Sequence, residues 1–388
     1  MSDVFIIGAG CSVPYGFPTG AMLMQKLKDF GYRDHFEYTA QHLLDWHYLF
    51  DLYPERLCIT FDKYKDKARL INHYDLRLNS EKQTINSIIS SVVNDFAKSI
   101  RHSMMVSTDE FLKNRLGQKQ NEQADFGKRL IAYEILKAEQ ASRLDNIDWI
   151  QHFLSRIDQQ TNWEEILKQT VFLTFNYDRV LEYCIFLYLT SDKQYADADA
   201  HAFISEMQIY HVNGFIGSLE EIPFGVVENG MYQEIAKRMA TVWEKRQNRD
   251  ESEKEKYQGF LRNARRVYFL GFSYIPDNLY SIGINRGAQI IQNAKVYATA
   301  MGLSPQNRLR ISSYLDLKDF ERRNEPEPMP EIEVQRTSFM TNVQYQLEYE
   351  KQERIAKAIA KSRQMHFENR ILKDASAVDL ILDYYTFS

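Results

Sequence analysis

Polar residues able to act on a sugar or a phosphate follow apolar runs at three places in the chain. They are Gly8, Ala9, Gly10 and Ser12; then Thr174, Asn176 and Asp178; then His211 and Asn213. Amide and carboxylate side chains can hold hydroxyl groups, and an imidazole can accept a proton. A glycine-rich turn after a strand lets a phosphate approach the backbone. Together these residue types indicate a ligand that carries both hydroxyls and phosphates.

The glycine turn directly follows the apolar run Val4–Ile7 and leads towards a predicted helix over Ala21–Phe30. A strand, turn and helix in this order present backbone N–H groups and a helix N-terminus to an anionic ligand. The common dinucleotide fingerprint G-x-G-x-x-G requires a glycine at the position of Val13, so that match fails. The chain continues instead with Ser12 and Pro18, and a bare turn without a ligand is the alternative interpretation.

The second and third clusters each allow two interpretations. Asn176 and Asp178 end an apolar run, where parallel α/β folds bind ligands, but they also suit the capping of a helix that begins near Arg179. His211 and Asn213 are two residues apart, so on an extended strand they point to the same face. A structural histidine that bonds to the backbone is the alternative for His211.

A fourth cluster follows the apolar run 266–272 and carries Gly271 and Ser273, with Asp277 four residues further on. A glycine and a serine at a strand end suit a backbone that a ligand approaches closely. An ordinary strand-to-turn transition is the alternative. Each cluster is a weak signal alone, and their occurrence in one order along the chain is the stronger observation.

In that order, the clusters resemble the motifs of the sirtuin-like superfamily. The opening is similar to its GAG-x-S and Gly-x-Pro element, T-F-N-Y-D to its Asn-x-Asp element, and Gly271-Phe272-Ser273 to its G-x-S element. The resemblance implies NAD as the ligand, with contacts from Gly8, Ala9, Gly10, Ser12, Pro18, Thr174, Gly271, Ser273 and Asp277. It implies catalytic roles for Asn176, Asp178, His211 and Asn213. The run 296–304 lies where such proteins hold the adenine.

One position departs from this pattern. The divergent prokaryotic branch usually reads Y-H-V-H-G, with the catalytic histidine directly before the glycine, whereas this chain has Asn213 there. An asparagine cannot take a proton from a ribose hydroxyl. Either His211 replaces that histidine, or Asn213 binds and orients the ribose while the chemistry is slow, or catalysis is lost.

The elements that must position these clusters are short, nearly continuous apolar runs. They lie at Asp3–Gly8, Thr170–Phe175, Gln208–Val212, Arg266–Phe272 and Ala294–Thr299. Such runs are typical of strands buried on both faces of a parallel sheet, and segments with helical spacing lie between them. We therefore predict an α/β fold with a Rossmann-like doubly wound parallel sheet. The sheet domain spans 1–30 and 164–320, with a large helical insertion at 31–163 and a helical C-terminal segment at 321–388.

The composition narrows the functional class. The chain has 388 residues, of which 44% are hydrophobic and 26% charged, with a net charge of -5, which argues against a surface dominated by nucleic acid. It shows no basic leader and no long apolar run, so we expect a cytoplasmic protein without membrane contact. Cys11, Cys58 and Cys184 lie far apart, which excludes a disulfide framework and argues against a cysteine-rich zinc site. Cys11 is expected to be a small buried residue.

These observations favour NAD+ hydrolysis over deacylation. Deacylating sirtuins carry a four-cysteine zinc ribbon that this chain lacks, so water is the expected acceptor and no metal is expected. Sirtuin-like proteins of this kind resemble NAD-depleting effectors of bacterial anti-phage defence. That resemblance implies a homo-oligomer and a partner ATPase or a phage-derived trigger. The alternatives are an NAD- or ADP-ribose-binding regulatory protein and an assembly subunit with a structural nucleotide.

Overall fold

The structure is a computed structural model of the chain. It describes residues 2–30, 52–53, 56–57, 95–105, 107–140, 144, 148–226, 231–239, 251–319, 330, 332, 342–367 and 370–387. Cys58, named above, lies outside these ranges. Of the helices within them, none combines the length and the apolar character that crossing a bilayer requires.

All five predicted strands form and join one sheet. They are β1 (Ser2–Ile7), β4 (Val171–Thr174), β5 (Gln208–His211), β6 (Ala264–Leu270) and β7 (Lys295–Thr299). Their side chains alternate between two hydrophobic cores, as the pleat of a strand requires. Phe5 and Ile7 of β1 enter one core, whereas Val4 and Ile6 enter the other. Burial on both faces explains why the runs of β1, β4, β6 and β7 are almost continuously apolar, whereas β5, at the edge of the sheet, is half-buried.

The strand order is β5-β4-β1-β6-β7-β9-β8, and every neighbouring pair is parallel. From β1 the chain builds the sheet towards β5, and it then returns to β6 on the opposite side of β1. The order therefore reverses between β1 and β6, which is where doubly wound folds form a crevice for ligands. The predicted Rossmann-like doubly wound fold is confirmed.

The C-terminal segment differs from the prediction of helix alone. Beyond β8 (Lys318–Asp319) and the long helix α16 (Asn342–Phe367), the chain forms β9 (Arg370–Lys373), which inserts between β7 and β8. The final helix, α17 (Ala377–Tyr384), then packs against α7 and β7. The sheet is thus completed by residues from the segment predicted as 321–388.

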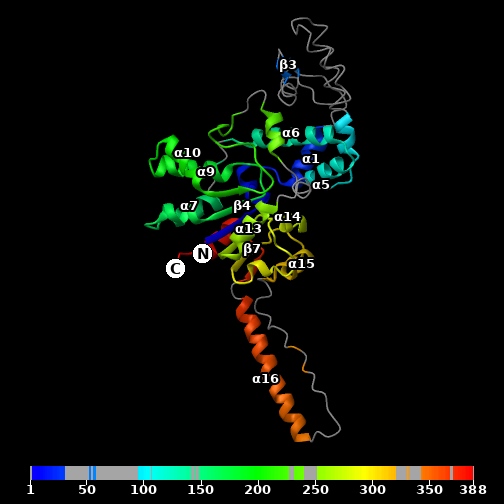
Figure 1. Ribbon diagram of the computed structural model, residues 1–388, viewed down its shortest axis with the longest axis vertical. Helices are drawn as coiled ribbons and strands as arrows, with labels where there is room; N and C mark the ends of the chain where they lie inside the picture. Colours follow the sequence, from blue (N-terminus) through cyan, green and yellow to red (C-terminus); the bar gives the residue numbers. More distant parts are fainter. Residues whose placement is uncertain are drawn as a thin grey trace.

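Helices cover both faces of the sheet (Figure 1). On the face of Phe5 lie α7 (Trp149–Asp158), α9 (Val180–Leu187) and α17, and the ring of Phe153 in α7 meets that of Phe5 at 5.2 Å. The opposite face is covered by α13 (Glu251–Arg262), α14 (Pro276–Ser281) and α15 (Pro305–Leu315).

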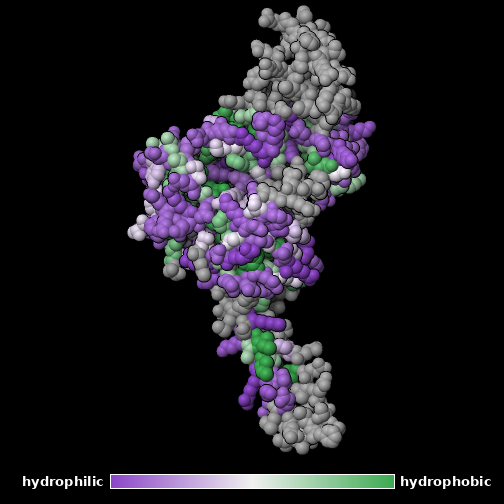
Figure 2. All heavy atoms as spheres, in the orientation of Figure 1, coloured by the Kyte–Doolittle hydropathy of each residue, from purple (hydrophilic) through white to green (hydrophobic). Residues whose placement is uncertain are grey.

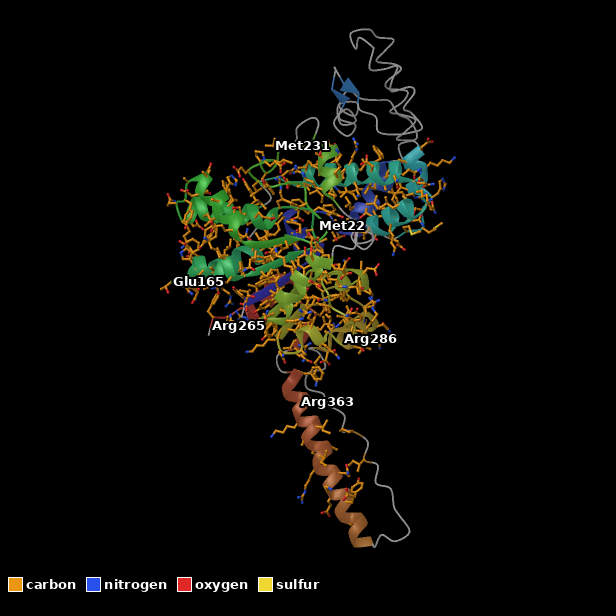
Figure 3. The ribbon with its side chains drawn as sticks, in the orientation of Figure 1. Met22, Glu165, Met231, Arg265, Arg286 and Arg363 are labelled. Atoms are coloured by element: carbon orange, nitrogen blue, oxygen red, sulfur yellow. The ribbon has the colours of Figure 1, made fainter. Side chains whose placement is uncertain are left out.

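The predicted insertion 31–163 is helical over most of its described part. Its helices α5 (Thr108–Gly117) and α6 (Asn121–Ala138) pack with α1 (Gly20–Phe30) and α11 (Tyr232–Arg238). Met22 and Met231 lie in this helical group (Figure 3). A two-stranded antiparallel pair, β2 (Leu52–Tyr53) and β3 (Arg56–Leu57), was not predicted. Helix α7 also falls within 31–163, yet it belongs to the cover of the sheet because its apolar stripe packs on β1 and β4.

Helix α16 projects from the rest of the molecule as a single long helix (Figure 1). Its surface carries a small hydrophobic area among hydrophilic residues (Figure 2), and Ile355 and Ile359 are exposed on it. Arg363 on this helix lies far from Arg265 beside the sheet (Figure 3). The functional clusters lie elsewhere, at the carboxyl ends of the central strands.

Candidate functional site

Asn176 lies just past the end of β4, and all but one of its hydrogen-bonding groups have a partner. Its backbone N–H donates to Thr174 Oγ1 (3.1 Å), and its carbonyl accepts from His211 Nδ1 (2.9 Å). Its side-chain Nδ2 donates to Gly8 O (3.2 Å) and to Ser12 Oγ (3.0 Å). The residue is buried, and its Oδ1 has no hydrogen-bond partner within the described part of the chain. A fixed, buried and unused acceptor is costly unless a ligand satisfies it.

Ser12 and Asp178 continue this network. The Ser12 hydroxyl accepts from Asn176 Nδ2 and donates to the Asp178 carboxylate, which also accepts from the N–H of Val180 (3.3 Å). Burial raises the pKa of Asp178 to about 6, although its hydrogen bond from Ser12 lowers it in part. The carboxylate is therefore ionised at neutral pH but close enough to its pKa to exchange a proton.

His211 and Asn213 both hold the backbone of the β4 turn. His211 Nδ1 meets the carbonyl of Asn176, and Asn213 Nδ2 donates to the preceding carbonyl, that of Phe175 (3.3 Å). The Oδ1 of Asn213 is also buried without a partner among the described residues. Two side chains at the end of β5 thus fix two consecutive carbonyls next to β4.

The other ring nitrogen of His211, Nε2, lies 2.5 Å from Oε1 of Glu182 in α9. Burial lowers the pKa of His211, but the negative charge of Glu182 and its hydrogen bond outweigh this, so the net pKa is raised. Both ring nitrogens are therefore occupied. In this arrangement His211 has no free nitrogen with which to take a proton from a ligand.

On the other side of Asn176, β1 and β6 meet through glycine backbone. Gly8 N–H donates to Leu270 O, and Gly10 N–H donates to Gly271 O, both at 3.0 Å. A Cβ at Gly8 would lie 2.5 Å from Gly271 O, and one at Gly271 would lie 2.3 Å from the backbone nitrogen of Cys11. The glycines are thus required by the packing of two turns. Ligand contact by Gly8, Ala9 and Gly10 stays a prediction.

The remaining predicted contacts lie around this junction. Gly271 N–H donates to Thr299 Oγ1 (3.0 Å), which links the turn after β6 to the end of β7. Ser273 is exposed, and Asp277 lies 3.5 Å from Lys113 Nζ of α5. Pro18 is buried. The hydrogen bonds of Asn176 go instead to Thr174, Gly8, Ser12 and His211. A role of Pro18, Gly271, Ser273 and Asp277 in ligand binding stays a prediction.

Cys11 and Trp149 close the site from the side of α7. The Trp149 indole N–H donates to Cys11 O (3.2 Å), and the thiol of Cys11 is buried. Burial raises the pKa of Cys11 well above its ordinary value. A buried, protonated thiol is inert, which agrees with the expectation that Cys11 is a packing residue.

Two cavities adjoin the cluster. A small one of about 10 Å³ is lined by Ser12, Thr174, Asn176 and Asp178, and it has room for one water molecule at most. A larger one of about 500 Å³ lies on the other side of His211 and has a volume typical of ligand pockets. Glu182 borders both cavities.

Sequence reasoning missed Glu182 and a second buried acid, Glu139. Glu139 pairs with Arg179 (2.6 Å), and Arg179 also donates to the carbonyls of Gly217 and Ser218, which line the larger cavity. The sequence does hold one signal for Glu182. It is the single charged residue of the helix VLEYCIFL, and a carboxylate amid apolar neighbours is seldom buried without a partner.

Within the described ranges, no group of three or more His, Cys, Asp or Glu side chains is placed to hold a metal ion. No protein-family model matches the chain, and no curated protein matches it significantly. The site must therefore be interpreted from its own geometry.

Proposed function

We propose that this protein hydrolyses NAD+ at the bond between nicotinamide and ribose, with water as the acceptor. The observation that carries the proposal is Asn176, whose backbone and amide nitrogen are fixed by four hydrogen bonds while its buried Oδ1 is unused. Such an acceptor suits a ribose hydroxyl or an attacking water. The order of the sequence motifs and the position of the site at the switch point between β1 and β6 support the same conclusion.

The chemistry needs little beyond what the cluster supplies. The glycosidic C–N bond breaks, its electron pair goes to the pyridinium nitrogen, and neutral nicotinamide leaves. The ribose is left with oxocarbenium character, which a nearby buried carboxylate stabilises strongly. Asp178 is such a group and is ionised above a pKa of about 6. Water then adds to the anomeric carbon and loses a proton, which yields ADP-ribose.

Asp178 is also the best candidate for the group that accepts this proton. Its pKa of about 6 is close to the operating pH, where general bases are most effective. His211 is engaged at both ring nitrogens, and Asn213 has no basic nitrogen. Asn213 therefore serves as a second acceptor for ribose hydroxyls through its unused Oδ1.

One observation favours a second candidate function, an NAD- or ADP-ribose-binding regulatory or assembly subunit. The position that precedes Gly214 holds Asn213, and the nearest imidazole, His211, is locked between Asn176 and Glu182. A site that has lost its histidine base binds the nucleotide and cuts it slowly or not at all.

The biological setting follows from the resemblance to sirtuin-like effectors. NAD+ depletion would serve anti-phage defence, with activity released by a phage-derived trigger or a partner ATPase acting on a homo-oligomer. We place such contacts on the helical group around α5 and α6. This part of the proposal rests on the resemblance alone.

The test is a product assay with the purified chain. NAD+ is added, and nicotinamide and ADP-ribose are quantified by chromatography over time. Release of both in equal amounts supports hydrolysis. Binding of ADP-ribose by calorimetry without product release, alone or with the products of neighbouring genes, supports the regulatory subunit and contradicts the hydrolase.

A further inference from the structure

The strongest unassigned feature is the carboxylate of Glu182 in the first turn of α9. Its side chain is 12% exposed and that of His211 is 6% exposed, so both partners are largely removed from water. The other residues of α9 are apolar or aromatic. Burying a carboxylate in such a helix is unfavourable unless a specific partner compensates, and the partner is His211 Nε2 at 2.5 Å.

His211 links Glu182 to Asn176, because its two ring nitrogens contact one residue each. A carbonyl oxygen only accepts hydrogen bonds, so the contact with Asn176 O places a proton on Nδ1. Glu182 then accepts from Nε2–H, and the ring carries a positive charge. Phe215 stacks on the imidazole at 4.8 Å with an angle of 19° between the rings, which blocks its rotation. The ring is thereby fixed in position and in protonation state.

Fixing the His211 ring also affects how the Asn176 side chain is oriented. The Nδ2 group of that side chain is bonded to Gly8 and Ser12, which directs Oδ1 away from them. The backbone that carries the side chain is tied at two further points, at N–H by Thr174 and at the carbonyl by His211. Without Glu182, the imidazole is free to lose its proton or tilt, and one of these two ties loosens. Displacements of about 1 Å in a reacting group can lower a rate by about 100-fold.

The cavities add an independent observation. Glu182 borders both the small cavity at Asn176 and the larger cavity of about 500 Å³, whose wall also includes His211. The pair thus forms part of the wall between the buried cluster and the space large enough for a ligand. A ligand in the larger cavity contacts the same pair that orients Asn176.

We propose that Glu182 is a positioning residue for NAD+ that acts through His211 to hold Asn176 in its ligand-binding orientation. This inference rests on the proposed function, because it names a residue that the function requires. The alternative is an ordinary buried ion pair that stabilises the contact between α9 and β5 and has no effect on the ligand. A positioning role predicts that removing Glu182 lowers the turnover of the protein that is still folded. A purely structural ion pair predicts that turnover falls only as far as the amount of folded protein falls.

The experiment compares Glu182→Gln, His211→Gln and the double variant with the wild type. Glu234→Gln is the matched control, because it removes the same charge from an exposed pair with Lys237 on α11. For each protein, kcat and KM for NAD+ and the melting temperature are measured. We expect each single variant to lower kcat by about 10- to 100-fold with KM changed less than about threefold. The double variant should be no slower than the slower single variant, because the two residues act as one unit.

Two results overturn the proposal. One is a Glu182→Gln variant that is folded and keeps kcat within about twofold of the wild type. The other is a double variant whose loss equals the product of the two single losses, which means that the residues act independently. If Glu182→Gln fails to fold, the same criterion for kcat is applied to His211→Gln.

The affinity for ADP-ribose separates this proposal from the hydrolase itself. If the wild type binds ADP-ribose but releases no nicotinamide, the hydrolase is wrong. Asn176 then acts in binding alone, and the positioning role predicts weaker ADP-ribose binding in Glu182→Gln and His211→Gln than in the wild type, whereas equal affinities overturn it. If the wild type turns over NAD+ and both variants match it, only the positioning role is wrong. A wild type that neither binds nor cuts contradicts both.

Discussion

The two halves of the site are built in different ways. On the side of β4 and β5, polar side chains hold one another and leave two buried acceptors, on Asn176 and Asn213, without partners among the described residues. On the side of β1 and β6, the contact is made mainly by backbone, and Gly8 and Gly271 bring two turns into direct contact.

This difference indicates that one half of the site serves ligand binding and the other serves the stability of the fold. Unused buried acceptors and an acid with a raised pKa lower the stability of the apo protein, and such groups collect where a ligand is expected. At the glycine junction the N–H groups of Gly8, Gly10 and Gly271 are bonded, and a Cβ added at any of the three would lie less than 3.0 Å from backbone. We therefore expect changes in the β1–β6 half to affect folding, and changes in the β4–β5 half to affect the ligand.

The largest expected effect is on the glycine junction. Gly271→Ala places a Cβ 2.3 Å from the backbone nitrogen of Cys11, in a residue whose φ is +54°, so the two turns must separate. We expect the free energy of unfolding to fall by at least about 3 kcal/mol, measured by chemical denaturation. Gly20→Ala is the control, because nothing lies within 4 Å of its added Cβ, and it should stay within about 1 kcal/mol of the wild type. A similar small loss in both variants would show that the junction is not tightly packed.

In the other half, Asp178→Asn should stabilise the protein. The folded-state pKa of Asp178 is raised from 3.8 to about 6, so its contribution to stability is complete below pH 3.8 and is lost as the pH rises through about 6. At pH 8 the ionised form is unfavourable by about 3 kcal/mol, and the variant removes this penalty. We expect a gain of about 2 kcal/mol at pH 8 and none at pH 3.5, with a large loss of turnover. Lower stability at pH 8 would contradict this interpretation of Asp178.

The ion pair between His211 and Glu182 should have a smaller effect on stability than Asp178, and this effect should appear at higher pH. Its folded-state pKa is raised because Glu182, with a contribution from Asp178, outweighs the burial that lowers it. The stability from the pair is therefore complete below pH 6.5 and is lost as the pH rises through the raised pKa. Melting temperatures measured between pH 6 and 9 should therefore fall in the wild type as the pH rises. His211→Gln should lack this dependence, and an identical profile in both proteins would be inconsistent with a charged His211.

The smallest effect on stability is expected at Asp277. Its contact with Lys113 at 3.5 Å joins two side chains that are 41% and 49% exposed, so Asp277→Asn should change the free energy of unfolding by less than about 0.5 kcal/mol. The sequence resemblance nevertheless predicts that Asp277 contacts NAD, so KM should rise. The free energy of unfolding and the KM for NAD+ are both measured on Asp277→Asn. A large loss of stability with an unchanged KM would show that Asp277 stabilises the fold and does not contact NAD+.

The strands β1, β4, β6 and β7 could be predicted because they are buried on both faces and are apolar almost throughout. The fifth predicted strand, β5, lies at the edge of the sheet and is half-buried. Strand β9 could not be predicted, because it carries Arg370, whose buried guanidinium donates to the carbonyls of Ile291, Ala294, Leu315 and Asp316. A charged residue in a four-residue strand removes the apolar signal. Its pairing with β7 joins segments about 70 residues apart, which no local pattern reports.

The residues of the site also fall into those that the local sequence predicts and those that only the fold brings together. Asn176, Asp178, His211 and Asn213 were predicted from their place at strand ends, and the structure brings them together around one turn. Glu182 was missed because its role depends on β5 lying next to β4, which only the fold establishes. The glycines were predicted, but for contact with a phosphate, whereas the structure places the backbone of Gly271 against Gly8 and Gly10.

The most direct test of the central claim is the rate of nicotinamide release from NAD+ by the wild type and by Asn176→Ala in the same assay. The claim is that the unused Oδ1 of Asn176 acts on the nicotinamide ribose. We expect release by the wild type and a rate at least about 100-fold lower in Asn176→Ala, with binding of NAD+ retained. Equal rates in the two proteins would contradict this role for Asn176, and no release by the wild type would contradict the hydrolase.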